Sequence, residues 1–497
     1  MPAALSAVAD ALPQARRDGG DADVVDATHD SRQVAHGSLF CCVPGSRVDG
    51  HDHAPRAVEA GASGLLVERW LDLPVPQVKV PSVRAAIGPA AAVVHGHPSH
   101  ELTVVGVTGT NGKTTTTALL EGAFAAAGWG TGVIGTVATR IHGDVVPGVR
   151  TTPEGTDLQR LLRTMCDRGV AGVAIEVSSH GLDLRRVDGT RFTVALYTNL
   201  SQDHLDWHGS MEAYLAAKAR LFTPGLSTRG IVHLDGPWGR RLRDVAEIPI
   251  TTFGVDEDAD HRVTEVTTDI SGGRAVVVSP EGRELEVRTG LLGDFNVTNA
   301  IGAVLAAEAA GVPIDAAVEG VAAASGPTGR MERVEAGQPF TVLVDYAHTP
   351  DALREVIAAV RDVLDPRGRV HVVVGCGGDR DRGKRPAMGD AAMTADVAVL
   401  TSDNPRSEDP LEILEAVERG ARAALAAGVE AELHVEVDRR EAIATALAGA
   451  GPGDVVLLAG KGHETGQEFA DRTVPFDDRE VAHELLRRAV AGRGGRR

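Results

Sequence analysis

Short apolar runs alternate with longer, alanine-rich amphipathic stretches through most of the chain. Runs such as 64–67, 170–177 and 193–198 are rich in aliphatic residues and lie between turn-forming or polar residues. Buried parallel strands have this near-continuous apolar composition, and the stretches between them have the length and periodicity of helices. The pattern therefore predicts α/β domains built on parallel sheets.

A second series of apolar runs occupies the last third of the chain, and each run ends directly in a polar or glycine-rich motif. The four runs are 341–345, 370–375, 397–401 and 455–459. In open parallel sheets, ligands bind beyond the carboxyl ends of the strands. These four endings therefore predict one shared cleft.

Length and motif positions predict three domains, because 497 residues exceed the usual size of one or two. We place them at 1–101, 102–329 and 330–497. The second domain opens with a glycine-rich loop, and the third contains the second series of strands.

Charge and cysteine content exclude several classes of protein. The formal net charge, 50 minus 69 or −19, argues against a nucleic-acid partner. The four cysteines have neither disulfide nor metal-ligand spacing, which favours a reducing compartment. There is no secretory hydrophobic region at the N-terminus, and no apolar stretch is long enough to span a bilayer. We therefore expect a cytoplasmic protein without membrane insertion.

The segment 104–117, VVGVTGTNGKTTTT, predicts a phosphate-binding loop. Glycines let backbone N–H groups approach phosphate oxygens, Lys113 would neutralise the outer phosphates, and Thr114 would offer its hydroxyl to Mg²⁺. Val107 stands where the strict Walker spacing has glycine, so the alternative is an ordinary glycine-rich turn between strand and helix. We expect a nucleoside triphosphate to bind the loop residues Gly109, Thr110, Asn111, Gly112, Lys113, Thr114 and Thr115.

Three further positions suit metal or amine chemistry. Glu176 ends an apolar run, where a carboxylate can hold Mg²⁺ or form a salt bridge. His204 lies in DHLDWH (203–208), which is either a metal-binding loop or merely a polar one. Lys218 lies in the helical stretch 212–222 and is one of only five lysines among 50 basic residues. This bias towards arginine favours a compact or reactive amine over an ordinary surface lysine.

The string TTPE (151–154) predicts the start of a helix. Thr151 and Glu154 would form a capping box, or Thr152 would cap a helix whose first residue is Pro153. An exposed helix N-terminus also attracts anions, so capping is compatible with ligand binding.

Three motifs in the last third of the chain suit a charged amino-acid ligand. They are the basic loop GGDRDRGKRP (377–386), DNPR (403–406) and GKGHE (460–464). Arg406 offers a planar fork for a carboxylate, and Glu464 could accept hydrogen bonds from an ammonium group. Each motif alone is compatible with a surface turn, but three at strand ends favour a site.

Together these strings resemble the Mur ligases, the ATP-dependent amide-forming enzymes of peptidoglycan precursor synthesis. The resemblance runs from HDSRQVAHGSLF to near the C-terminus and includes EVSSHGL, GDFNVTNA, SGPTGRMERV and VDYAHTPDAL. The motifs look like those of family members that add the third residue of the stem peptide, and DNPR looks like the form specific for meso-2,6-diaminopimelate. The resemblance implies an N-terminal substrate-binding α/β domain, a central P-loop ATPase-like domain with a parallel sheet, and a C-terminal Rossmann-like domain.

The resemblance also implies a reaction. The D-glutamate carboxylate of UDP-N-acetylmuramoyl-L-alanyl-D-glutamate attacks the γ-phosphate of ATP, and the amino group of diaminopimelate then displaces phosphate from the acyl phosphate. Implied cofactors are ATP and Mg²⁺ at two sites, with a CO₂-derived carbamate on Lys218 as a ligand of the second. No obligate protein partner is implied.

Site residues follow from the same resemblance. The implied catalytic residues are Lys113, Lys218 and His204; the metal ligands are Thr114, Glu176, His204 and Lys218; and further ATP contacts are Asn299, Arg330 and Asp345. The implied contacts to the UDP-linked substrate are Ser31, Thr151, Thr152, Ser178 and Arg186, and those to diaminopimelate are Arg380, Asn404, Pro405, Arg406, Gly460 and Glu464.

Selectivity for diaminopimelate is expected because Arg406 and Arg380 would be buried and unpaired without its distal carboxylate. Leu184 departs from the glutamine of some relatives, so that polar contact is absent or replaced. The rival interpretations are a sister ligase that adds lysine or D-alanyl-D-alanine, a folylpolyglutamate synthase, and a P-loop ATPase switch. The switch gives no role to Lys218.

Overall fold

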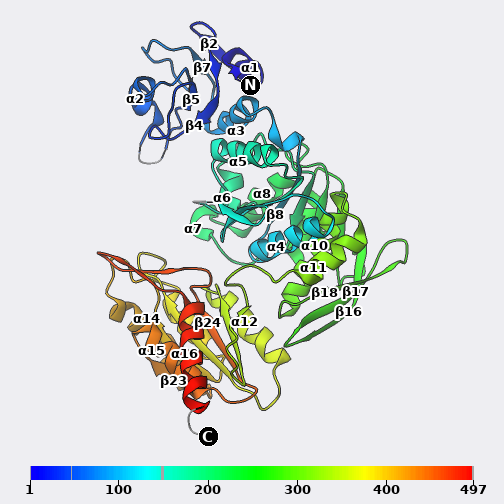
Figure 1. Cartoon of the computed structure of the whole chain (residues 1–497), viewed down its shortest axis with the longest axis vertical. Helices are drawn as coiled ribbons and strands as arrows, with labels where there is room; N and C mark the ends of the chain where they lie inside the picture. Colours follow the sequence, from blue (N-terminus) through cyan, green and yellow to red (C-terminus); the bar gives the residue numbers. More distant parts are fainter. Residues whose placement is uncertain (1, 46–47, 147–149, 495–497) are drawn as a thin grey trace. The chain divides into compact units, whose positions relative to one another are not determined.

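The computed structural model describes residues 2–45, 48–146 and 150–494, which form two compact units (Figure 1). One unit comprises the described residues up to Glu265 together with Ala275–Arg288 and Thr298–Ala324. The other comprises Val266–Arg274, Thr289–Val297 and the described residues from Ser325 onward.

The N-terminal part of the first unit is a five-stranded sheet in the order β2-β7-β6-β5-β4, parallel except for β2. Alternate residues of β5 face opposite layers: Leu39 and Cys41 pack with α1 and α3, and Phe40 packs with α2. The elements are β1 (Ala3–Ala4), α1 (Leu5–Asp10), β2 (Arg16–Asp18), β3 (Asp23–Val24), β4 (Asp26–Thr28), β5 (Ser38–Cys41), α2 (Ala54–Glu59), β6 (Gly64–Val67), β7 (Gln77–Lys79) and α3 (Val83–Val94).

The central sheet has eleven strands in the order β11-β10-β9-β12-β8-β13-β14-β15-β16-β17-β18. β8 lies between the parallel strands β12 and β13, so the loops that follow these three strands meet at one edge. The strands are β8 (Thr103–Thr108), β9 (Thr131–Ile134), β10 (Thr139–Ile141), β11 (Asp144–Val146), β12 (Gly172–Glu176), β13 (Val194–Tyr197), β14 (Gly230–His233), β15 (Ile250–Gly254), β16 (His261–Asp269), β17 (Gly272–Val278) and β18 (Glu284–Thr289). The helices are α4 (Lys113–Ala126), α5 (Gly155–Asp167), α6 (Ser179–Asp183), α7 (Leu205–His208), α8 (Met211–Ala219), α9 (Pro237–Val245), α10 (Asp294–Ala309) and α11 (Ile314–Ala323).

The second unit is built on a six-stranded sheet in the order β19-β20-β24-β21-β22-β23, parallel except for β19. Helices α12, α13 and α14 pack on one face and α15 and α16 on the other, which makes a doubly wound domain. The elements are β19 (Glu332–Arg333), β20 (Thr341–Asp345), α12 (Pro350–Val363), β21 (Val370–Cys376), α13 (Arg385–Ala392), β22 (Val397–Ser402), α14 (Pro410–Ala426), β23 (Glu432–Val435), α15 (Arg439–Gly449), β24 (Val455–Ala459), β25 (Gly466–Glu468), β26 (Thr473–Pro475) and α16 (Asp478–Gly494).

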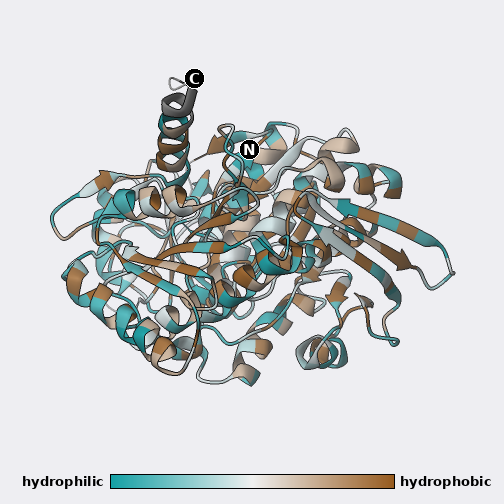
Figure 2. Cartoon of the chain, turned by 90° about the horizontal axis from the view of Figure 1, so that it is seen from below, coloured by the Kyte–Doolittle hydropathy of each residue, from teal (hydrophilic) through white to brown (hydrophobic). Residues whose placement is uncertain are grey.

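The predicted α/β architecture is confirmed: parallel pairs dominate the sheets, and the central sheet is mixed because β10 pairs antiparallel with β9 and β11. Every apolar run named from the sequence is a buried strand, and the hydrophobic residues coloured brown in Figure 2 follow strands and inner helix faces, with hydrophilic residues common on loops. No helix in the described part of the chain is long and apolar enough to cross a membrane. The domain boundaries at 101/102 and 329/330 stay a prediction.

Candidate active site

The predicted phosphate loop connects β8 to α4 at the centre of the eleven-stranded sheet. Gly112 has a φ of 86°, and a Cβ atom there would lie 2.4 Å from Oδ1 of Asn299. A Cβ atom on Gly109 would lie 1.9 Å from Oγ1 of Thr198. Both glycines are therefore required by close neighbours, and the loop lies against Asn299, one of the residues expected to contact ATP.

Lys113 lies over the loop that precedes it. Its Nζ donates to the carbonyl oxygens of Gly109 at 2.9 Å and Thr110 at 2.8 Å. The loop is also tied to the end of β13, because Thr198 Oγ1 donates to the Asn111 carbonyl at 2.6 Å. This gives a rigid, glycine-lined turn with one ammonium group, as phosphate binding requires.

Lys218 is buried in α8, with 1% of its surface exposed. Its Nζ donates to the Gly109 carbonyl at 2.8 Å and lies 4.4 Å from the centroid of the Tyr214 ring. Burial and the neighbouring Lys113 hold the pKa of Lys218 well below its usual range, against the opposing effect of Asp203. A larger neutral fraction makes the amine a better nucleophile, which carbamate formation needs.

His204 also packs against Tyr214, edge to face, with ring centroids 6.1 Å apart. Its backbone is left-handed, with φ 52°, and its Nε2 is 3.3 Å from the Asp203 carboxylate. Burial is the largest influence on the pKa of His204 and lowers it, which favours the neutral imidazole that a metal requires. The ring also packs edge-on against His180 at 4.7 Å.

Glu176 is buried at the end of β12, beside the strand that leads into the phosphate loop. Its two carboxylate oxygens accept from the Thr136 backbone N–H at 2.8 Å and hydroxyl at 2.9 Å. No three His, Cys, Asp or Glu side chains in the described ranges form a group that could hold a metal. Three of the four predicted donors fit Mg²⁺ in kind, because the Thr114 hydroxyl, the Glu176 carboxylate and a carbamate on Lys218 are hard oxygen ligands, whereas His204 would add an imidazole nitrogen.

The residues expected to contact the dipeptide form one hydrogen-bonded cluster next to Glu176. Thr152 Oγ1 donates to the Glu176 carbonyl at 2.9 Å, accepts from the Ser178 backbone N–H at 3.0 Å and lies 3.1 Å from Ser178 Oγ. Thr151 Oγ1 lies 3.0 Å from the Thr136 hydroxyl, which reaches Glu176. The structure therefore brings Thr151, Thr152, Ser178 and Glu176 together.

Glu154 is the centre of an arginine cluster rather than part of a capping box. Helix α5 begins at Gly155, and no side chain caps it, so both predicted caps are wrong. The Glu154 carboxylate instead contacts Arg84 at 2.6 Å, Arg150 at 2.5 Å and Arg186 at 2.9 Å. Burial opposes ionisation of Glu154, but Arg186 and Arg84 outweigh it and lower its pKa. Three cations thus share one buried anion, and Arg186 also donates to the Thr152 carbonyl at 3.3 Å.

Ser31 lies half-buried in the turn after β4, within the N-terminal sheet domain. Two residues before it, the His29 ring nitrogen Nδ1 lies 3.0 Å from Thr156 Oγ1 on α5. This turn therefore faces the segment that carries the dipeptide cluster.

In the second unit, Arg330 and Asp345 lie in two segments that contact each other. The Arg330 guanidinium stacks 4.8 Å from the Tyr346 ring, and Asp345 accepts from the backbone N–H groups of Met331 at 2.9 Å and Ala347 at 2.8 Å. Burial raises the pKa of Asp345, and the Arg330 charge opposes that effect. Both predicted nucleotide contacts are held firmly in place.

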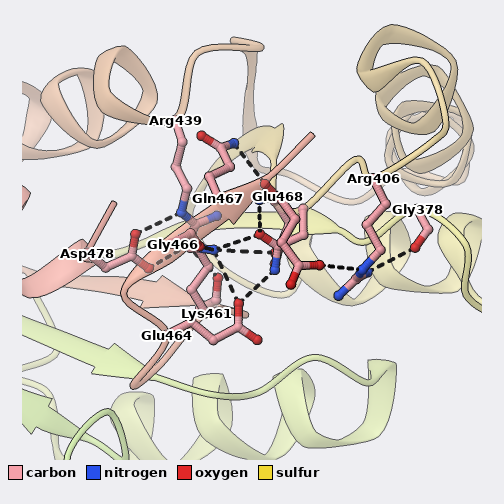
Figure 3. Close-up of polar contacts among 12 residues, drawn as sticks. Gly378, Arg406, Arg439, Lys461, Glu464, Gly466, Gln467, Glu468 and Asp478 are labelled. Carbon is pink, nitrogen blue, oxygen red and sulfur yellow. Dashed lines mark hydrogen bonds and ion pairs between the residues drawn. The ribbon is translucent and has the colours of Figure 1, made fainter. Parts of the chain in front are cut away.

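The amino-acid motifs converge at the carboxyl ends of β22 and β24, as predicted (Figure 3). Asn404 Nδ2 donates to Glu464 Oε2 at 2.7 Å, and Lys461 Nζ donates to Asn404 Oδ1 at 3.1 Å and to Glu464 Oε2 at 3.2 Å. Lys461 is fully buried, and Gly460, with φ 107°, lies close to the Asp403 carboxylate. Pro405 and Asn404 are both buried within this network.

Arg406 and Arg380 differ from expectation. Arg406 Nε donates to Glu468 Oε2 at 2.7 Å, and Nη1 donates to the Gly378 carbonyl at 2.9 Å. Arg380 is exposed. The expectation that both arginines are buried and unpaired without a ligand is therefore wrong, because a carboxylate of the chain already balances Arg406.

Several residues of these clusters were absent from the predicted site. Lys461 was visible in the sequence as a rare lysine in GKGHE, whereas Glu154 was assigned only to a cap. Glu468 and Arg84 had no signal, since their partners Arg406 and Glu154 lie 62 and 70 residues away in the sequence. Arg150 lies four residues before Glu154, a spacing that the sequence analysis did not use.

Three family models match consecutive parts of the chain: "Mur ligase family, catalytic domain" at 26–108, "Mur ligase middle domain" at 107–307 and "Mur ligase, glutamate ligase domain" at 329–462. They agree with the expected three-domain organisation. A relative from Streptomyces coelicolor is 46% identical, over 97% of this chain and 96% of its own. One from Geobacillus thermodenitrificans is 45% identical, over 94% and 96%. Both are named UDP-N-acetylmuramoyl-L-alanyl-D-glutamate--2,6-diaminopimelate ligase.

Solved structures give the same result for the fold. A structure with that ligase name is 33% identical, covers 94% of this chain and 96% of its own, and superposes with a TM-score of 0.70. A D-alanyl-D-alanyl-adding ligase from Acinetobacter baumannii, at 20% identity, covers 99% of each chain with a TM-score of 0.64. The second likeness concerns the fold alone.

Proposed function

The chain belongs to the Mur ligase family, and from that membership we propose that it joins meso-2,6-diaminopimelate to the D-glutamate of UDP-N-acetylmuramoyl-L-alanyl-D-glutamate, with conversion of ATP to ADP and phosphate. The observation that carries this proposal is the near full-length similarity to relatives named for the reaction. The site supports it, because the phosphate loop and the amino-acid cluster each have the chemistry that one half of the reaction needs.

In the first step, a γ-carboxylate oxygen of the D-glutamate attacks the γ-phosphorus of ATP, and ADP leaves. Negative charge develops on the phosphoryl oxygens, so fixed cations and backbone N–H groups contribute most of the catalysis. Lys113 and the loop from Gly109 to Gly112 would hold these phosphates, while Asn299, Arg330 and Asp345 would position the nucleotide. Thr114 and Glu176 would hold one Mg²⁺ ion, and His204 with a carbamylated Lys218 would hold a second; both would supply further charge neutralisation.

In the second step, the neutral amino group of diaminopimelate attacks the acyl carbon, loses a proton and displaces phosphate. The dipeptide must be held still for this attack, and we assign that role to Thr151, Thr152, Ser178 and Arg186. Ser31 would contact the uridine end of the substrate from the N-terminal domain.

The cluster around Asn404 and Glu464 suits the amino-acid substrate. Glu464 can accept from an ammonium group, and Arg406 can donate to a carboxylate through the donors left free by Glu468 and Gly378. Gly460, Pro405 and the exposed Arg380 would complete the contacts.

The product is a peptidoglycan precursor, so we place the enzyme in the cytoplasm, where ATP and UDP-linked sugars are available. Cell-wall synthesis, and with it cell shape and division, would depend on the reaction. We expect small-molecule substrates and no obligate protein partner.

The test is ADP release in the presence of ATP, Mg²⁺ and the UDP-linked dipeptide, with meso-diaminopimelate and L-lysine compared at equal concentration. Turnover with diaminopimelate and little with lysine is expected. A preference for lysine or D-alanyl-D-alanine would indicate a sister ligase, and ADP release that needs no amine would indicate an ATPase switch.

A further inference from the structure

Glu468 lies at the end of β25, in a hairpin that the DNPR loop holds by several bonds (Figure 3). The backbone N–H of Glu468 donates to Asn404 Oδ1 at 3.0 Å, and the Arg406 N–H donates to the Glu468 carbonyl at 3.0 Å. Gln467 Nε2 donates to the Asp403 carbonyl at 2.8 Å, and Lys461 Nζ to the Gly466 carbonyl at 2.7 Å. The hairpin is thus part of the amino-acid cluster.

The Arg406 side chain is held at two of its donors. Nε donates to the Glu468 carboxylate and Nη1 to the Gly378 carbonyl, so three of the five guanidinium N–H donors make no hydrogen bond to the described residues. The Arg406 backbone has φ 51°, a left-handed conformation that costs a non-glycine residue free energy and is concentrated at functional sites. Backbone and side chain are therefore both fixed in one orientation.

The ion pair between Arg406 and Glu468 should contribute little to the folding stability of the protein. Glu468 is 51% exposed as a side chain and Arg406 24%, and exposed ion pairs contribute little to folding. Glu464, in contrast, has its carboxylate next to the fully buried Lys461. Glu468 is thus the carboxylate that lies directly beside Arg406.

We propose that Glu468 is a further specificity-determining residue of this site: it orients Arg406 and, together with it, selects an amino acid whose far end carries both an ammonium and a carboxylate group. The proposal rests on the proposed function and adds a residue to the same site. Arg406 donates to the ligand carboxylate, and Glu468 shares with Glu464 the role of accepting from the adjacent ammonium, since the other amino group of diaminopimelate reacts as the neutral amine. An amino acid with only an ammonium group at its distal end is repelled by the positive charge of Arg406. An amino acid with only a carboxylate at its distal end is repelled by the negative charge of Glu468.

Three amines separate these effects: meso-diaminopimelate, L-lysine without the distal carboxylate, and L-2-aminopimelate without the distal ammonium. Glu468→Gln keeps an acceptor oxygen for Arg406 Nε but removes the charge, whereas Glu468→Ala removes both. The matched control is Glu484→Gln, which breaks an Arg–Glu pair of 2.5 Å with Arg440 between α15 and α16; neither residue belongs to the amino-acid motifs.

For Glu468→Gln, kcat/KM for diaminopimelate relative to 2-aminopimelate should fall about ten- to a hundredfold, the value of a lost hydrogen bond to a charged group. The KM for ATP should not change. Glu468→Ala should lower kcat/KM for both amines that carry a distal carboxylate, because Arg406 loses its fixed orientation. Glu484→Gln should behave as the unmodified enzyme.

If the ratio of kcat/KM for diaminopimelate to kcat/KM for 2-aminopimelate is unchanged in Glu468→Gln, the inference is overturned. Turnover of diaminopimelate by the unmodified enzyme would in that case still uphold the proposed function. An equal loss for all three amines, or a parallel rise in the KM for ATP, would also overturn it. If the unmodified enzyme turned over no amine, the proposed function would fail and the inference with it.

Discussion

Replacing Glu154 by glutamine should reveal how strongly one buried carboxylate organises the arginines of the dipeptide cluster. Glu154 is 5% exposed, and its two oxygens contact Arg84, Arg150 and Arg186 at 2.5–2.9 Å. The glutamine has nearly the same shape but no charge. The change therefore leaves three guanidinium groups close together without their shared anion.

The expected loss of stability is about 3 kcal/mol. A unit charge pair roughly 4 Å apart attracts by about 4 kcal/mol at an effective dielectric of about 20, and each arginine provides one such attraction. Replacing the carboxylate also removes the free-energy cost of burying its charge, which offsets part of this attraction. Breaking a buried ion pair therefore usually costs about 3–5 kcal/mol of stability. We take the lower end because the Arg150 side chain is 49% exposed.

Urea unfolding followed by tryptophan fluorescence measures this loss, because Trp70, Trp129, Trp207 and Trp238 all lie in the first unit. The matched control is Glu101→Gln, which breaks an exposed pair with Arg163 in the same unit. An exposed pair contributes at most about 1 kcal/mol. Binding of the UDP-linked dipeptide should also weaken in the Glu154 variant, since Arg186 loses its fixed position.

Acidification supplies a second check with a defined sign. The pKa of Glu154 is lowered in the folded protein, so its contribution is complete above the unfolded value of about 4.3 and is lost as pH falls through the folded pKa. The stability difference between the two proteins should thus be constant near pH 7 and narrow below about pH 4.3. A loss no larger than that of Glu101→Gln, or a difference that does not depend on pH, would refute the organising role of Glu154.

Three other substitutions test two parts of the site and one buried ion pair of the second unit. Lys218→Ala should abolish activity, with partial rescue by short carboxylates, and should remove the carbamate signal seen by NMR after labelling with isotopic CO₂; a fully active variant would dismiss the carbamate. Gly112→Ala should weaken ATP binding measured by calorimetry, because φ is 86° and the new Cβ would lie 2.4 Å from Asn299 Oδ1; unchanged affinity would show that the loop relaxes freely. Arg439→Met should destabilise the second unit by about 3–5 kcal/mol, because it leaves the Asp478 carboxylate buried and unpaired. Hydrogen exchange in α15 and α16 measures this, and addition of Asp478→Leu should recover most of it.

Buried strands could be predicted from the sequence because a strand that is buried on both faces of its sheet consists of consecutive apolar residues. β6, β20 and β24 begin and end at the predicted residues. The hairpin β25–β26 could not be predicted, since its strands have three residues each and little buried apolar surface. Its position depends on hydrogen bonds to a loop some sixty residues earlier, and local composition carries no trace of such bonds.

The same distinction applies to the site. Asn404 and Glu464 were expected to meet because their motifs follow parallel strands of one sheet, and they do. Glu154 was expected to form a capping box with Thr151, but its carboxylate forms ion pairs with Arg84 and Arg186 instead. Local rules fail here because an ion pair with distant arginines outweighs a single capping bond of about 1 kcal/mol.

The scarce lysines show how one residue type serves two purposes in this enzyme. Lys218 and Lys461 are both almost completely buried, and both donate to backbone carbonyls. Lys461 also has the Glu464 carboxylate 3.2 Å away, so its charge is balanced and it can hold the amino-acid cluster together. Burial depresses the pKa of Lys218, and the neighbouring Lys113 adds to that effect. The two buried amines therefore differ in their charged neighbours: Lys461 forms an ion pair with Glu464, whereas burial and Lys113 make Lys218 a candidate nucleophile for CO₂.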